Sequence, residues 1–293
     1  MQQFPLGIFF SLLDGIALAG FYTFNKKISR SGSPLQIIFW ICATHLPPLL
    51  IWAALSLPLR VSAGYFLPGM GVVLLTVLGN VLSIRALSLS PFGLMMPVMC
   101  LSPVFTSLIG IPLLHEWPAA HQWLGIVLAV LGVLWLYVPP EKPFSVFSFW
   151  PQFFRERGAR SMVGSALCWS LSAPMDKVAL QYAEPAFHAT FVFSGLVLFL
   201  FIWLSLRKEW STAPIARNYW GLLFLTGAAG AAADVLQLFA VLNAPVGTVE
   251  AIKRVASQVL GVGVSIFLFH EGMTLPKTIG MIIICIGVPM IVL

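Results

Sequence analysis

The sequence predicts an all-α polytopic membrane protein with ten transmembrane helices, arranged as two inverted five-helix repeats. Three observations predict this fold class. Of the 293 residues, 59% are hydrophobic and only 9% are charged, whereas a soluble domain has about 25% charged residues. Apolar windows of about 20 residues recur along the whole chain, and each is long enough to cross a hydrocarbon core of about 30 Å. The second half of the sequence is also similar to the first.

The first half contains five predicted spans, at residues 5–27, 34–57, 65–88, 92–114 and 119–138. The first of them starts without a basic segment and continues well past 15 apolar residues, so we expect a retained span rather than a secretory signal. Prolines interrupt the backbone hydrogen bonds of a helix and offer bend points for gating. Such prolines occur in the second and fourth spans, at Pro47, Pro48, Pro97, Pro103 and Pro112.

A linker at residues 141–160 joins the repeat at 1–140 to the repeat at 161–293. It holds Phe, Trp and Arg with little continuous apolar length, which is typical of an amphipathic segment at the headgroup boundary. The second repeat contains the spans 161–183, 186–206, 219–242, 246–269 and 275–293. Small residues from Gly227 to Ala233 predict that a neighbouring helix approaches the eighth span closely.

The repeat has a clear anchor near the end of each half. LIGIPLLHE ends at Glu116, VSIFLFHE ends at Glu271, and one more span follows each. Asn25-Lys26 also falls on Asp176-Lys177. An odd number of spans in each unit inserts the second unit with the opposite orientation. Basic residues concentrate in the odd-numbered loops, so the positive-inside rule places these loops in the cytoplasm and both termini on the other side.

The sequence gives no indication of a metal or another cofactor. The His-Glu pairs at the ends of spans four and nine lack the second His of a zinc-binding His-Glu-x-x-His motif, and we expect them to orient interfacial turns. The cysteines lie far apart within apolar segments, where packing is the expected role. They are Cys42, Cys100, Cys168 and Cys285.

Polar residues inside the spans are the candidates for a functional site. An ionised side chain at a helix centre costs about 2.5–3.5 kcal/mol, so it normally faces a partner or a water-filled cavity. In EAIKRVASQ, Glu250 and Arg254 are four residues apart and can pair along a helix, while Lys253 is rotated by about 100° from Arg254. The predicted substrate-binding residues are Lys253, Arg254, Glu250, Asp14, Asp234, His45, Asn80, Gln258 and Lys177.

These residues have alternative structural roles. Lys253 and Arg254 are expected to touch substrate, the alternative being structural ion pairs, and for Glu250 both roles stay open. Asp14 and Asp234 lie near the centres of their spans and are too short to snorkel, so each is a candidate proton acceptor or counter-ion. Lys177, near a span end, can snorkel to the headgroups. His45 is a lone histidine on an apolar helix, and such a residue more often packs and forms a hydrogen bond in the interior than binds a ligand.

The ten spans, the two five-span units and the endings LLHE and FLFHE resemble the drug/metabolite transporter superfamily, specifically its EamA-type members. The segment AIKRVASQVLGVGVSIFLFHE is also similar to the sugar-phosphate and nucleotide-sugar translocator branch. In that branch a Lys-Arg pair grips the phosphate of the substrate, and the resemblance implies that Lys253 and Arg254 bind an anionic group. The resemblance to EamA-type members implies export as the commoner direction.

We therefore expect a secondary transporter, an exporter or exchanger, working by alternating access. Its substrate would be a small polar metabolite with an anionic group, such as an amino acid, a zwitterion or a phosphorylated compound, and its drive an exchange gradient or protons. The alternative is a membrane-embedded enzyme or a flippase acting on a phosphorylated lipid. We expect a monomer or dimer in the lipid bilayer of a bacterial inner membrane. No nucleic-acid partner is expected, because no basic stripe with interleaved aromatics occurs.

Overall fold

The computed structural model describes residues 4–29, 31–114, 119–135, 155–210, 219–270, 272 and 274–290. Almost all of this part of the chain is helical. The first unit contains α1 (Phe4–Ile28), α2 (Pro34–Leu55), η1 (Ala63–Tyr65), α3 (Phe66–Leu89), α4 (Phe92–Val98), η2 (Met99–Leu101), α5 (Ser102–Leu114) and α6 (Ala120–Trp135). The second contains α8 (Arg157–Ala179), α9 (Pro185–Arg207), α10 (Trp220–Asn243), α11 (Val246–Phe267) and α12 (Leu275–Met290).

The predicted spans agree with these helices to within about four residues, and the all-α fold class is confirmed. Pro34 and Pro185 stand at the first turns of α2 and α9, where the missing proline N–H has no helical partner to lose. Within the described residues, five helices are long and apolar enough to cross a membrane by composition alone: Pro5–Ile28, Pro34–Leu55, Ala63–Leu89, Pro185–Arg207 and Trp220–Asn243.

The fourth span is interrupted at its centre. The short 3₁₀ helix η2 separates α4 from α5, in the part of the sequence where prolines predict a bend. Ser102 directly follows this 3₁₀ segment and is the first residue of α5. The prolines of the second span act differently, because α2 continues through Pro47 and Pro48 without a break.

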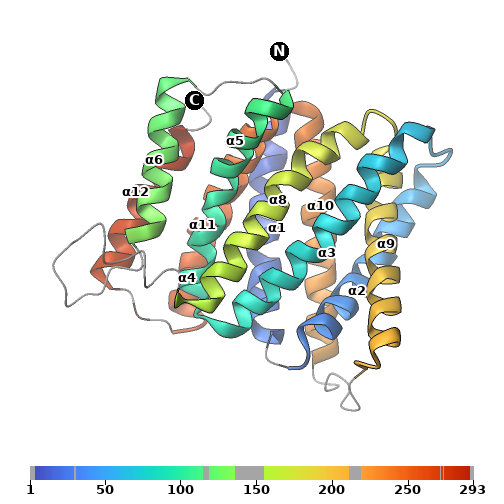
Figure 1. Ribbon diagram of the computed structural model, residues 1–293, viewed down its shortest axis with the longest axis horizontal. Coiled ribbons are helices and arrows are strands. Elements are labelled where there is room, and N and C mark those ends of the chain that lie inside the picture. Colours follow the sequence, from blue (N-terminus) through green and yellow to red (C-terminus); the bar gives the residue numbers. More distant parts are fainter. Residues whose placement is uncertain are drawn as a thin grey trace.

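The most extensive packing joins one unit to the other. The third helix of the first unit, α3, lies along α8, the first of the second unit, and α10 lies along α1 in the reciprocal arrangement. The pairs α2 with α9 and α6 with α12 join equivalent helices. Figure 1 shows α6 and α12 at one edge of the bundle and α2 and α9 towards the other. This exchange is the packing expected of two inverted repeats that share one core.

The loop between α2 and α3 is joined to the loop between α8 and α9, at the upper right in Figure 1. Val61 and Ala183 form an isolated antiparallel bridge. The Ser62 amide donates to the Tyr182 carbonyl at 2.8 Å, and the Glu184 amide donates to the Arg60 carbonyl at 3.0 Å. We call residues 60–62 with 182–184 the loop clasp. It holds the two units together at the end of the bundle that carries the even-numbered loops.

The opposite end is also tied. The Lys26 ammonium, at the end of α1, donates to the carbonyls of Leu87 at 2.8 Å and Ser90 at 2.6 Å, at the end of α3. Most of the predicted linker, residues 141–154, lies outside the described part of the chain. The division at 1–140, 141–160 and 161–293 therefore stays a prediction.

Candidate functional site

The three charged residues of α11 all face the interior of the bundle. Glu250, Lys253 and Arg254 are 1%, 3% and 2% exposed. Helix α1 approaches them closely because it has Gly15 at the crossing: a Cβ atom there would come within 2.7 Å of the Lys253 carbonyl oxygen. The small residue lets the side chain of Asp14, its neighbour, face α11.

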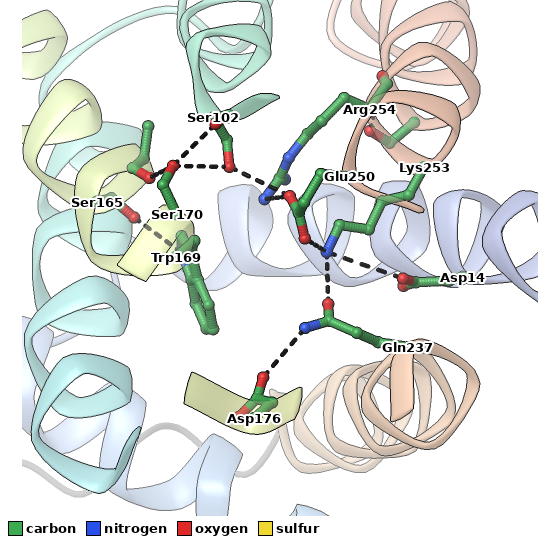
Figure 2. A network of polar contacts seen from close by, with 12 residues as sticks. Asp14, Ser102, Ser165, Trp169, Ser170, Asp176, Gln237, Glu250, Lys253 and Arg254 are labelled. Atoms are coloured by element: carbon green, nitrogen blue, oxygen red, sulfur yellow. Dashed lines mark hydrogen bonds and ion pairs between the residues drawn. The ribbon is translucent and has the colours of Figure 1, made fainter. Parts of the chain in front are cut away.

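Lys253 is the centre of a buried polar network (Figure 2). Its ammonium donates hydrogen bonds to Glu250 on its own helix and to Gln237 on α10, and lies 3.9 Å from Asp14 Oδ2. Arg254 Nη2 lies 3.6 Å from Glu250 Oε2, so the predicted pairing of these two residues is confirmed. Glu250 thus bridges both cations of the motif and lowers the cost of burying them.

The interrupted fourth span supplies a further partner for Glu250. Ser102, the first residue of α5, donates to Glu250 Oε2 at 3.2 Å. Ser170 on α8 in turn donates to the Ser102 carbonyl at 3.0 Å. The Ser102 hydroxyl, from the first unit, thus contacts the Glu250 carboxylate of the second unit, and Ser170 of α8 contacts the backbone of Ser102.

A cavity lies beside Lys253 and Arg254. The volume open to the centres of water molecules is about 40 Å³, room for about three waters. Polar and aromatic residues from both units line it: Asp14, Tyr22, His45, Asn80, Trp169, Phe193, Asp234, Gln237, Lys253 and Arg254.

Two groups at this cavity have unused hydrogen-bonding capacity. Arg254 Nε and Nη1 are buried donors without a partner, and Asp14 Oδ2 is a buried acceptor without a donor, among the residues that the structure describes. A buried polar group without a partner costs about 1–3 kcal/mol. Arg254 and Asp14, which both line the cavity, thus contain buried polar atoms without a hydrogen-bond partner, although Asp14 Oδ2 also lies in the ion pair with Lys253.

His45 and Asp234 form the opposite wall. His45 Nε2 lies 3.5 Å from Asp234 Oδ2, and the imidazole stacks on Phe193 with ring centroids 4.5 Å apart. His45 is buried, whereas the Asp234 side chain is 31% exposed. Gly230 lies against the imidazole ring, and Gly227 lies against Thr44. The predicted close approach of a helix to the small residues of α10 is therefore confirmed, and that helix is α2.

A second cavity adjoins the first and contains residues that the sequence analysis did not single out. It has about 30 Å³ for water centres and shares Trp169, Phe193, Asp234 and Gln237 with the first cavity. Its polar lining is formed by Asp176 of α8 and His188 of α9. The match of Asp176 with Asn25 in the repeat was the available signal, because it marked a carboxylate inside a span. Nothing local in the sequence marked His188.

Three of the predicted site residues play a smaller part in this arrangement. Asn80 lines the first cavity, but its amide nitrogen donates to the Thr76 carbonyl of its own helix at 2.9 Å. Gln258 is buried and faces Cys100, whose thiol lies 3.9 Å from its amide oxygen. Lys177 is exposed and lines neither cavity.

The remaining motifs lie away from the site. His270 follows α11 and is exposed, with a left-handed backbone conformation. His115, Glu116 and Glu271 fall outside the described residues. Cys42, Cys100 and Cys168 are buried and Cys285 is half-buried. Among the residues that the structure describes, no group of His, Cys, Asp or Glu side chains is arranged to hold a metal ion.

The model of the EamA-like transporter family matches residues 5–138 and 157–293. The fold is similar to that of a solved crystal structure with a TM-score of 0.67 and 13% sequence identity, over 96% of this chain and 95% of that chain. A comparison with curated proteins finds no match. Members of the family are transporters rather than enzymes, which sets the enzyme alternative aside. The chain belongs to the EamA-like transporter family of the drug/metabolite transporter superfamily, and is an integral membrane transporter of small molecules.

Proposed function

We propose that the protein is a secondary transporter of a small zwitterionic metabolite of the amino-acid type. One observation carries this proposal: Arg254, which has unused hydrogen-bond donors, and Asp14, which has an unused acceptor, line the same cavity. A zwitterion brings a carboxylate for the first and an ammonium group for the second. Binding would then satisfy buried groups on both sides, instead of leaving one of them without a partner.

Each residue has a distinct role in this proposal. Arg254 binds the carboxylate through its unpartnered nitrogens Nε and Nη1, each of which can donate a charge-assisted hydrogen bond. Asp14 accepts from the ammonium group. Lys253 already donates hydrogen bonds to Glu250 and Gln237. It therefore contributes positive potential to the site and holds these two side chains in position. Tyr22 and Trp169 provide aromatic surface beside the ligand.

The charges around the site favour a zwitterion over a phosphorylated compound. Asp14, Asp234 and Glu250 lie in or beside the first cavity with only two cations, Lys253 and Arg254. A phosphate group would bring about 1.5 to 2 further negative charges into a low-dielectric environment that already has more carboxylates than cations. A zwitterion adds no net charge, so its desolvation cost is the smaller one.

The transport cycle follows from the packing of the two units. The loop clasp closes the end with the even-numbered loops, and the cavity is too small for a metabolite. Separation of the clasp would open the cavity at that end, and separation of the Lys26 contacts would open it at the other. In this proposal the two inverted units rock about the Lys253 network, in a bacterial inner membrane.

A ligand panel tests the proposal on the purified protein. Alanine, serine, glutamine and threonine are compared with matched carboxylates that lack the amine, with matched amines that lack the carboxylate, and with phosphoserine and sugar phosphates. A ligand present at about 100 times its Kd raises the free energy of unfolding by about 2.7 kcal/mol, which thermal unfolding detects. We expect stabilisation by zwitterions alone. Equal stabilisation by the amine-free analogues, or stabilisation by phosphorylated compounds only, would refute the proposal.

A further inference from the structure

A hydrogen-bonded trio lies at the far side of the second cavity. His188 Nε2 is 3.1 Å from Asp176 Oδ1, and His188 Nδ1 is 2.9 Å from the Tyr65 hydroxyl. All three side chains are buried. A tyrosine hydroxyl can donate or accept, and an imidazole has one proton when neutral and two when charged. The trio therefore keeps both hydrogen bonds whether or not His188 holds an extra proton.

Among the described residues, the carboxyl groups at the two cavities outnumber the fixed cations. Four carboxyl groups line the cavities or bond to Lys253: Asp14, Asp176, Asp234 and Glu250. Lys253 and Arg254 supply the positive charge. An unbalanced charge inside a membrane protein is costly. Histidine is the side chain that ordinarily changes its charge between about pH 5 and 8, so a proton on His188 would reduce the imbalance next to Asp176.

Gln237 connects this trio to the substrate site. Its amide nitrogen donates to Asp176 Oδ2 at 3.4 Å, while its amide oxygen accepts from Lys253 (Figure 2). One side chain thus spans the distance between the two acid clusters. A change in charge at Asp176 and His188 therefore acts on the Gln237 amide, which also contacts Lys253. Such coupling is reciprocal, so a change at Lys253 also affects Asp176 and His188.

We propose that His188 and Asp176 form the proton-binding site of this transporter, and that Gln237 links its occupancy to Lys253. This proposal rests on the proposed function, because it names the ion that drives the proposed secondary transport. The Tyr65–His188 hydrogen bond joins the two units and lies next to the loop clasp, since Tyr65 follows the clasp residues by three positions. Opening of the clasp would therefore expose the proton site to the solution at that end.

Titratable groups from every neighbouring helix face this site. Asp176 is contributed by α8 and Tyr65 by η1 at the start of α3. Asp234 of α10 lines the same cavity, and Lys253 of α11 acts on Asp176 through space. From α2, His45 faces Asp234.

The test follows the protonation of His188 directly. The full chain, labelled with ¹⁵N-histidine and placed in lipid nanodiscs, is studied by NMR between pH 5 and 9, and the His188 signals are assigned by their loss in His188→Gln. We expect His188 to pass from one protonated ring nitrogen to two. Asp176→Asn removes the negative partner and should lower the titration midpoint. Lys177→Gln, an exposed change at the next position, should leave the midpoint in place.

Two results would overturn the proposal. One is a His188 ring that keeps a single protonated nitrogen over the whole range, and the other is the same midpoint in Asp176→Asn as in the natural sequence. The linking role has its own test: Lys253→Met should raise the midpoint in the chain with Gln237 and change it less in Gln237→Leu. Equal changes in both backgrounds would remove that role. None of these measurements uses a substrate, so failure of the zwitterion panel and failure of the proton site are distinguishable.

Discussion

Replacing Arg254 by lysine separates the geometry of the site from its charge. In the structure, Nη2 faces Glu250 at 3.6 Å, while Nε and Nη1 have no partner among the described residues. A lysine has one nitrogen in place of the three of arginine, so it cannot contact Glu250 and also offer separate donors at the places of Nε and Nη1. Loss of one charge-assisted hydrogen bond costs about 1.5–3 kcal/mol, which corresponds to a dissociation constant about 10- to 150-fold higher.

Isothermal titration with the zwitterion that binds most tightly in the panel measures this change. Arg85→Lys is the matched control, because Arg85 is exposed on α3 and lines neither the first nor the second cavity. Thermal unfolding without ligand shows whether Arg254→Lys folds normally, and we expect it to, since Glu250 keeps Lys253 and Ser102 as partners. A Kd within about twofold of the natural protein would show that Arg254 does not hold the ligand.

Three further changes test other parts of the site. Asp14→Asn removes the proposed ammonium acceptor, so the Kd of a zwitterion should rise about tenfold or more while that of its amine-free analogue does not rise; equal losses would contradict the pairing. Gly230→Ala should cost about 1–3 kcal/mol in thermal unfolding because its methyl group meets the histidine ring of α2. Gly221→Ala, where a Cβ meets nothing within 4 Å, should cost much less. A disulfide between Val61→Cys and Ala183→Cys should stop uptake into proteoliposomes until it is reduced; undiminished uptake by the cross-linked protein would show that the clasp is not a gate.

The helices and their order could be predicted because each depends on local composition. Apolar length sets a span, and proline and small residues set its ends, so α4 and α5 were expected to cover Phe92–Leu114 with an irregular centre. The pairing of Glu250 with Arg254 was predictable for the same reason, since helical periodicity alone brings them together. That these side chains face inward also follows from the cost of exposing them to lipid.

The contacts between spans could not be predicted in this way. His188 lies near the start of its helix, where a histidine ordinarily faces the interface, and its pairing with Asp176 depends on how α9 packs against α8. Tyr65 lies at a span end and contacts the other unit. Lys177, one residue from Asp176, is exposed, because neighbouring residues of a helix are rotated by about 100° from one another. The packing of the helices thus decides which of two neighbouring residues is buried and which is exposed.

The reciprocal packing of α1 with α10 and α11 also has a consequence for biogenesis. Asp14 enters the bilayer with the first helix, whereas Lys253 is made near the end of the chain. At a synthesis rate of about 5–20 residues per second, Lys253 is made about 10–50 s after Asp14. During this interval α1 lacks α10 and α11, the two helices on which it packs most extensively, so the first unit cannot complete its native packing until the second has been made.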